Sequence, residues 1–206
     1  MSVKAASLKG RIPDAALSFI DQKLTEHKVR LLITRTRKSK SGDYRAPYQQ
    51  LGHRISVNGT LNQYAFLIVL LHELAHLEVW NKHRNKVLPH GVEWQRMFTE
   101  LAKPLMNATI FPDDLLDELT LFFQRPPASS AGALHLARAL KKYDKNAEEI
   151  TLLEEIPMGS HFMLPDGRVF VKELKQRTRF KCFCLNNKRY YLVSPVAEVI
   201  HRSAMA

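Results

Sequence analysis

The stretch Leu70-Leu-His-Glu-Leu-Ala-His-Leu77 decides how the chain is interpreted, because His72, Glu73 and His76 form an H-E-x-x-H pattern. Successive residues of an α-helix turn by about 100°, so histidines four positions apart project from one face, about one turn apart. Two such imidazoles can hold one metal ion. The carboxylate of Glu73 can reach a water on that ion without being a ligand itself. The pattern therefore indicates a zinc hydrolase.

The alternative is a buried helix that tolerates two histidines. Residues 64–80 are the most apolar segment of the chain, and burying an unpaired charge there is unfavourable. A bound metal removes this objection. The helix is expected to begin near residue 61, because Thr60 and Gln63 match a capping box, and to run to about Trp80. Since it is apolar on most of its circumference, we expect it to be the buried central helix.

A short sheet is expected to precede this helix. Residues 13–27 have the apolar spacing of an amphipathic helix. Residues 28–37, 44–48 and 53–57 then indicate three short strands of a small antiparallel sheet, with a turn at 38–43. The arginines of these strands suit either a solvated face or a polyanion-binding surface.

A third metal ligand is not fixed by the H-E-x-x-H pattern. His83 would lie about 10 Å from His76 along a continuing helix, too far to share one ion. The extended pattern with glycine and histidine three and six residues after His76 fails, because Val79 and Lys82 hold those positions. None of the remaining formal candidates has a better claim than His90, which stands between Pro89 and Gly91 where a new helical pattern over 92–106 begins. The other candidates are Glu78, Glu93 and Glu100.

These motifs resemble those of the SprT-like family, which comprises the bacterial SprT proteins and the Spartan proteases. The resemblance covers residues 10–125 and rests on the H-E-x-x-H pattern, on His90-Gly91 with Trp94 three residues further on, and on the preceding strand that ends at residues 55–58. It implies a helical, zincin-like core, one zinc ion held by His72, His76 and His90, and Glu73 as the general base. It also implies proteolysis associated with DNA, because the Spartan proteases degrade proteins crosslinked to DNA.

The second half of the chain indicates a smaller module. Residues 112–123 read as a short helix, residues 124–132 are rich in proline, serine and glycine, and residues 134–143 form a further helical pattern. Residues 159–164, 168–174, 178–185 and 189–194 indicate four strands in two hairpins, as in a small barrel of SH3-like or OB-like size. The fold class is therefore α+β, with a metalloprotease domain at 1–125, a linker with a short helix at 126–155 and a basic β module at 156–206.

The β module combines basic and aromatic residues. Such a strip could neutralise phosphates and stack on the bases of single-stranded or partly unpaired DNA, or the aromatic side chains could simply form the core. Cys182 and Cys184 are one residue apart and have no second pair, so the zinc ribbon that many SprT-like proteins carry here is not expected. The basic candidates for DNA contacts are Lys175, Arg177, Arg179, Lys181, Lys188 and Arg189.

Charge and composition complete the prediction. The formal charge is +11, and the excess lies in residues 1–60, with 12 basic and 4 acidic side chains, and in 161–206, with 9 and 3. No signal-peptide or membrane-spanning pattern is present, and two cysteines suit a reducing compartment, so we expect a cytoplasmic protein. The prediction is a zinc endopeptidase in which Glu73 activates a zinc-bound water and which acts on DNA-associated or DNA-crosslinked proteins. The alternative is a nucleic-acid-binding protein whose zinc is structural.

Overall fold

A computed structural model describes residues 7–35, 40–124, 133–145 and 150–202 of the chain. The protein has an α+β fold with two sheets and divides into two compact units. The first comprises residues 1–128 with 143–145, and the second comprises 129–142 with 146–206. The predicted domain boundaries stay a prediction, because the break after residue 125 falls outside the described residues. No helix among the described residues is long and apolar enough to cross a membrane.

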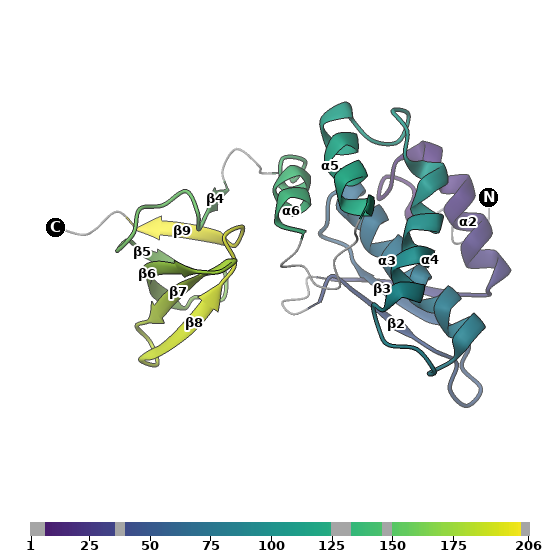
Figure 1. The fold of residues 1–206 in the computed structure, drawn as a ribbon, viewed down its shortest axis with the longest axis horizontal. Coiled ribbons are helices and arrows are strands. Elements are labelled where there is room, and N and C mark those ends of the chain that lie inside the picture. The colour runs from purple at the N-terminus through teal and green to yellow at the C-terminus, as the bar shows by residue number, and fades with distance from the viewer. Residues whose placement is uncertain (1–6, 36–39, 125–132, 146–149, 203–206) are drawn as a thin grey trace. The chain divides into compact units, whose positions relative to one another are not determined.

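The helices follow the apolar spacing of the sequence. Helix α3, which contains the H-E-x-x-H residues, is buried around much of its circumference and contacts α4 as well as strands β2 and β3 (Figure 1). Helix α4 buries Trp94, Met97, Phe98 and Leu101 at the i, i+3, i+4, i+7 positions of one apolar stripe. The helices are α2 Leu17–Glu26, α3 Gln63–His83, α4 Val92–Ala102, α5 Asp113–Gln124 and α6 Leu134–Lys141, with the 3₁₀ turns η1 Asp14–Ala16 and η2 Lys103–Leu105.

The start of α3 differs from the prediction. The N-cap is Asn62, whose side-chain oxygen accepts from the backbone N–H groups of Tyr64 and Ala65 at 3.1 and 2.9 Å. The predicted capping box is wrong, because the Thr60 hydroxyl donates instead to the Asn58 side chain. Asn62 can serve as the N-cap because its side-chain amide oxygen accepts from the first free N–H groups of the helix, as a serine or threonine hydroxyl would.

The first sheet is mixed, so the predicted antiparallel sheet is corrected. Its strands are β1 Arg30–Thr34, β2 Gly42–Arg45 and β3 Arg54–Asn58, in the order β1-β3-β2. Strand β3 lies antiparallel to β2 and parallel to β1, with Tyr44 opposite Ile55 and Ile33 opposite Val57. The parallel pair arises because β1 and β2 run in opposite directions and β3 inserts between them, so it must match one of the two.

The second unit contains a six-stranded antiparallel sheet in the order β4-β9-β5-β6-β7-β8. The four predicted strands correspond to β5–β8, while β4 and β9 were missed. Strand β4 has two residues, too few to show alternation. The core of this sheet includes Phe162, Phe170, Phe180, Cys182 and Cys184. The strands are β4 Thr151–Leu152, β5 His161–Met163, β6 Val169–Gln176, β7 Arg179–Cys184, β8 Arg189–Val193 and β9 Glu198–Arg202.

Candidate metal centre

Three imidazoles meet at one point of the first unit. His72 and His76 project from α3, and His90 reaches them from the residue that precedes the N-cap of α4. Their Nε2 atoms form a nearly equilateral triangle, with separations of 3.2 Å for His72–His76, 3.0 Å for His76–His90 and 3.2 Å for His72–His90. Among the described residues these three histidines are the group able to share an ion.

The triangle fits a zinc ion. Three nitrogen ligands at about 2.0–2.1 Å from a tetrahedral zinc lie about 3.3 Å from one another, close to the separations found here. Burial and then the neighbouring imidazoles lower the pKa of His72 to about 3, and burial and then His90 lower that of His76 to about 4. Burial also lowers the pKa of His90. The rings therefore stay neutral at pH 7 and present lone pairs, as a metal requires.

Trp94 holds the three rings in place. Its side chain is 1% exposed, and its ring centre lies 4.6 Å from that of His72, 5.4 Å from that of His76 and 4.7 Å from that of His90. Its indole N–H donates to the backbone oxygen of His72 at 3.4 Å. Trp94 therefore packs against the two histidines of α3 and against His90 of the following loop. This packing gives the tryptophan of the sequence motif a physical role.

The loop that presents His90 has an unusual backbone. Arg84, directly after α3, has φ 55°, and its N–H closes the helix on the Trp80 oxygen at 2.8 Å. His90 has φ 60°, and the next residue, Gly91, donates its N–H to the Leu88 oxygen at 3.0 Å. Both residues have a positive φ although neither is glycine. The tight turn at His90 directs its side chain back over α3.

The carboxylate of Glu73 lies under strand β2. Glu73 is 6% exposed, and the backbone N–H of Tyr44 is its hydrogen-bond donor. A Cβ at Gly42 would lie 2.5 Å from Glu73 Oε1, so the carboxylate packs directly against the backbone of β2. Burial, and then the charge of Asp43, raise the pKa of Glu73 to about 7, although the Tyr44 hydrogen bond and the charge of Lys40 oppose them.

The sequence patterns did not identify Gly42 and Tyr44 as residues of the site. The sequence placed Gly42 in a turn, whereas it begins β2 and faces Glu73. A glycine within a strand is a known signal of close approach by another group. The signal could not be recognised from the sequence, because the strand was expected to begin after Gly42. The contact of Tyr44 is made by its backbone, which carries no sequence signal.

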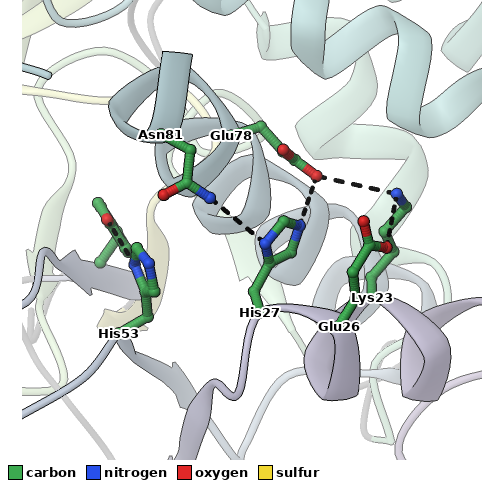
Figure 2. Close-up of polar contacts among 7 residues, drawn as sticks. Lys23, Glu26, His27, His53, Glu78 and Asn81 are labelled. Atoms are coloured by element: carbon green, nitrogen blue, oxygen red, sulfur yellow. Dashed lines mark hydrogen bonds and ion pairs between the residues drawn. The ribbon is translucent and has the colours of Figure 1, made fainter. Parts of the chain in front are cut away.

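The other candidate ligands lie elsewhere. Glu78 accepts from His27 Nε2 at 2.8 Å and is 3.8 Å from Lys23 Nζ, and Asn81 contacts the second ring nitrogen of His27 at 3.3 Å (Figure 2). This set ties the end of α2 to α3. Glu100 pairs with Arg96 at 3.1 Å. Neither Glu93 nor His83 belongs to the three-histidine group.

The predicted basic strip of the second unit is only partly assembled. Lys175, Arg177 and Arg179 gather at the exposed turn between β6 and β7, whereas Lys188 and Arg189 lie at the β7–β8 turn. Consecutive turns of an antiparallel meander lie at opposite ends of the strands, here about 20 Å apart for the six residues of β7. Lys181 lies between them, 3.5 Å from Glu173 and 3.9 Å from the Tyr190 ring centre.

The aromatic residues of the strip divide between the core and the open face. Phe170 and Phe180 are buried, as the core interpretation expected, whereas Phe183 and Tyr190 lie on the open face with ring centres 5.1 Å apart. Lys172, another basic residue of β6, is buried: it is 3% exposed, and its Nζ donates to the Ile156 oxygen at 2.7 Å. It faces inward because its position on β6 alternates with those of the outward residues.

The cysteines of this unit are strand residues. Cys182 and Cys184 are free, buried and part of the core. Burial raises the pKa of the Cys182 thiol to about 11. Neither belongs to a group of potential metal ligands among the described residues.

The first unit thus defines a class of protein, one with three histidines placed to hold a metal ion and a buried glutamate next to the first of them on the same helix. Residues 15–115 match the SprT-like family, and this part of the chain belongs to it. The family points to a metalloprotease-type function. No curated protein and no solved structure matches the chain.

Proposed function

We propose that this protein is a zinc-dependent endopeptidase of SprT-like type. The observation that carries the proposal is the triangle of Nε2 atoms at 3.0–3.2 Å, together with the buried Glu73 that follows His72 on the same helix. Zinc held by His72, His76 and His90 would supply a Lewis acid, which polarises a peptide carbonyl and lowers the pKa of water. Three neutral histidines would leave the ion its full charge and would leave room for water or substrate to bind it.

Glu73 acts as the general base in this proposal. Its pKa of about 7 lets the carboxylate accept a proton from the attacking water and pass it to the leaving amine near neutral pH. The Tyr44 N–H and the backbone at Gly42 hold the carboxylate in one place, so the proton is transferred along a fixed path. A purely structural metal would need no buried base beside its ligands, and this favours catalysis over the structural-zinc alternative.

The proposal is tested by measuring zinc and cleavage together. Purified protein should contain about one zinc per chain by elemental analysis, and His90→Ala should lose most of it. Glu73→Gln should keep the zinc and lower cleavage of a DNA-bound protein substrate by about 10²–10⁴-fold. Glu78→Gln is the matched control, because Glu78 lies on the same helix and contacts His27 instead of the metal centre. Full cleavage by Glu73→Gln, or protein free of zinc, would reject the peptidase.

We further propose that the substrates are DNA-associated or DNA-crosslinked proteins, and that the second unit binds single-stranded or partly unpaired DNA. Five of the six basic candidates are exposed, and Tyr190, which is 55% exposed beside Phe183, offers a ring on which a base can stack. The separation of the two basic turns suits a strand of DNA that runs across β7 and β8 and contacts phosphates at both ends.

DNA binding is tested by its dependence on salt. Affinity for a single-stranded oligonucleotide should fall with increasing salt concentration, and replacing Arg177, Arg179 and Lys188 by alanine should weaken binding and make the salt dependence shallower. Tyr190→Ala should weaken binding with no change in salt dependence, since stacking releases no counterions. Lys82→Ala with Lys103→Ala removes exposed charges from the first unit and serves as the control. Equal losses in the control and in the three-site variant would contradict this assignment of the DNA surface.

A further inference from the structure

A cavity of ≈280 Å³ opens directly beside His76 and His90. Val79 and Trp80 from the last turns of α3 form one part of its lining, and Tyr44 from β2 forms another. The loop between α3 and α4 closes it with apolar side chains, among them Leu88 and Pro89. The space next to two of the three metal ligands is thus largely apolar, and none of the proposed catalytic steps uses it.

The Tyr44 and Trp80 side of the cavity is held by successive ring contacts. Tyr44 Oη and His53 Nδ1 are joined by a hydrogen bond of 2.9 Å. The His53 ring meets the edge of Trp80 at 5.3 Å between centres, and the guanidinium carbon of Arg84 lies 4.0 Å from the Trp80 ring centre. Because each group packs against the next, this side keeps its shape without a ligand.

Arg84 brings a positive charge to the cavity. It lines the space and is exposed, and among the described residues no carboxylate forms an ion pair with it. Its planar guanidinium lies on Trp80, where the ring face attracts a cation. A lysine or arginine side chain that entered the cavity would meet this charge, whereas an apolar side chain would meet Val79, Trp80 and Leu88.

We infer that the cavity is a substrate subsite for one apolar side chain, branched or aromatic, next to the scissile bond, and that Arg84 excludes basic side chains from it. This inference rests on the proposed peptidase function. Its volume lies just below the range of about 300–1,000 Å³ usual for whole small-molecule ligands, so it suits one side chain with the adjoining backbone. Its place beside His76 and His90 puts that side chain within reach of the peptide bond held at the metal centre.

The binding experiment uses the full-length Glu73→Gln protein, which keeps the cavity and does not cleave. Both tryptophans of the chain, Trp80 and Trp94, line the cavity, so their indole N–H signals in NMR spectra report on its occupancy. The probes are acetyl-Ala-Ala-Xaa-Ala-amide peptides in which Xaa is leucine, phenylalanine or lysine. The leucine and phenylalanine peptides should shift the indole signals at concentrations at least about tenfold lower than the lysine peptide, because like charges in contact are strongly disfavoured.

A second variant tests the role of the charge. When Arg84→Glu is added, the concentration of lysine peptide that shifts the indole signals should come within about threefold of that of the leucine peptide. Attraction between the lysine and the introduced glutamate replaces repulsion by Arg84. Lys82→Glu makes the same charge change two residues away, at a side chain that does not line the cavity, and should leave the tenfold difference in place. Indole shifts that do not depend on Xaa, or no shift with any peptide, would overturn the subsite. Cleavage by the unmutated protein without such shifts would reject the subsite alone, whereas selective shifts without any cleavage would reject the peptidase alone.

Discussion

The glycine at position 42 lies directly against the side chain of Glu73. An added Cβ would lie 2.5 Å from Glu73 Oε1 and 2.7 Å from Val69 Cγ1, closer than such atoms approach one another. The same strand carries Tyr44, whose N–H holds the Glu73 carboxylate. Strand β2 therefore fixes the Glu73 carboxylate by a steric limit at Gly42 and by a hydrogen bond from Tyr44 two residues later.

Gly42→Ala should lower activity more than it lowers stability. The new methyl group must displace the Glu73 carboxylate, and a misplacement of about 1 Å can reduce a rate by about 100-fold. Zinc content should stay unchanged, since the three histidines are untouched. Gly52→Ala is the control, because a Cβ there meets no atom within 4 Å. Cleavage rates and zinc content of both variants check this, and equal rates would show that Glu73 moves freely.

A pH effect is expected from Glu154 in the second unit. Arg138 donates to both of its carboxylate oxygens, at 2.5 and 2.6 Å, and this pair lowers the pKa of Glu154 below its ordinary value of 4.5. The folded state therefore binds its proton less readily than the unfolded state. The resulting stabilisation is present above about pH 4.5 and is lost as the pH falls through the lowered pKa.

Urea unfolding between pH 3 and 7, followed by circular dichroism, measures this effect. Glu154→Gln should lose less stability on acidification than the unmutated protein, because its side chain cannot titrate. Identical pH dependences would mean that the Arg138 pair contributes nothing to stability.

At the scale of the elements, the helices were the most predictable part of the fold. Residues 13–27, 61–80 and 112–123 were expected to be helical, and α2, α3 and α5 lie there. Residues 13–27 have apolar side chains at helical spacing, whereas residues 61–80 form an apolar stretch too long for a single strand. The sheets were less predictable. The parallel pairing of β1 with β3 depends on which strand inserts between which, and β4 is too short to show a pattern.

In the candidate metal centre too, some residues were predictable from local spacing and others were not. The positions of His72 and His76 follow from helix geometry alone, so the sequence was sufficient to place them on one face. The sequence alone left several glutamates as alternatives to His90 for the third ligand. The turn that directs the His90 ring back over α3 appears only in the three-dimensional structure. Arg84 and Tyr44 had no local signal at all, because their roles depend on contacts with Trp80 and Glu73.

The cap of α3 gives a prediction at this scale. Asn62→Ala should destabilise the first unit by about 1 kcal/mol, because two N–H groups at the helix start lose their acceptor. Thr60→Ala should have a smaller effect, since its hydroxyl contacts Asn58 rather than the helix. Denaturant midpoints measured by tryptophan fluorescence compare the two variants. A larger loss for Thr60→Ala would restore the capping box that the sequence suggested.

At the scale of the whole molecule, the two units carry separate natural probes. Both tryptophans, Trp80 and Trp94, lie in the first unit, and both cysteines, Cys182 and Cys184, lie in the second. Fluorescence thus follows the unfolding of the first unit, while thiol reactivity follows that of the second, because both thiols are buried when the sheet is folded.

Removal of the metal should act on one unit only. A chelator should lower the melting temperature seen by fluorescence, because zinc bound only to the folded state stabilises it. The temperature at which the thiols become reactive should not change, since the second unit has no group of metal ligands among its described residues. Adding zinc back should restore the first transition. A parallel fall of both transitions would place a metal in the second unit as well.

The loop between α3 and α4 contains two residues with positive φ that are not glycine, Arg84 and His90. Each conformation is unfavourable by roughly 1–2 kcal/mol for a residue with a side chain, and glycine at either position would relieve it. Glycine would also remove a guanidinium from the cavity or an imidazole from the metal centre. Selection for a more stable fold and selection for a working site therefore oppose one another at these two positions. A screen for thermostability alone should enrich glycine there and, in doing so, recover inactive proteins.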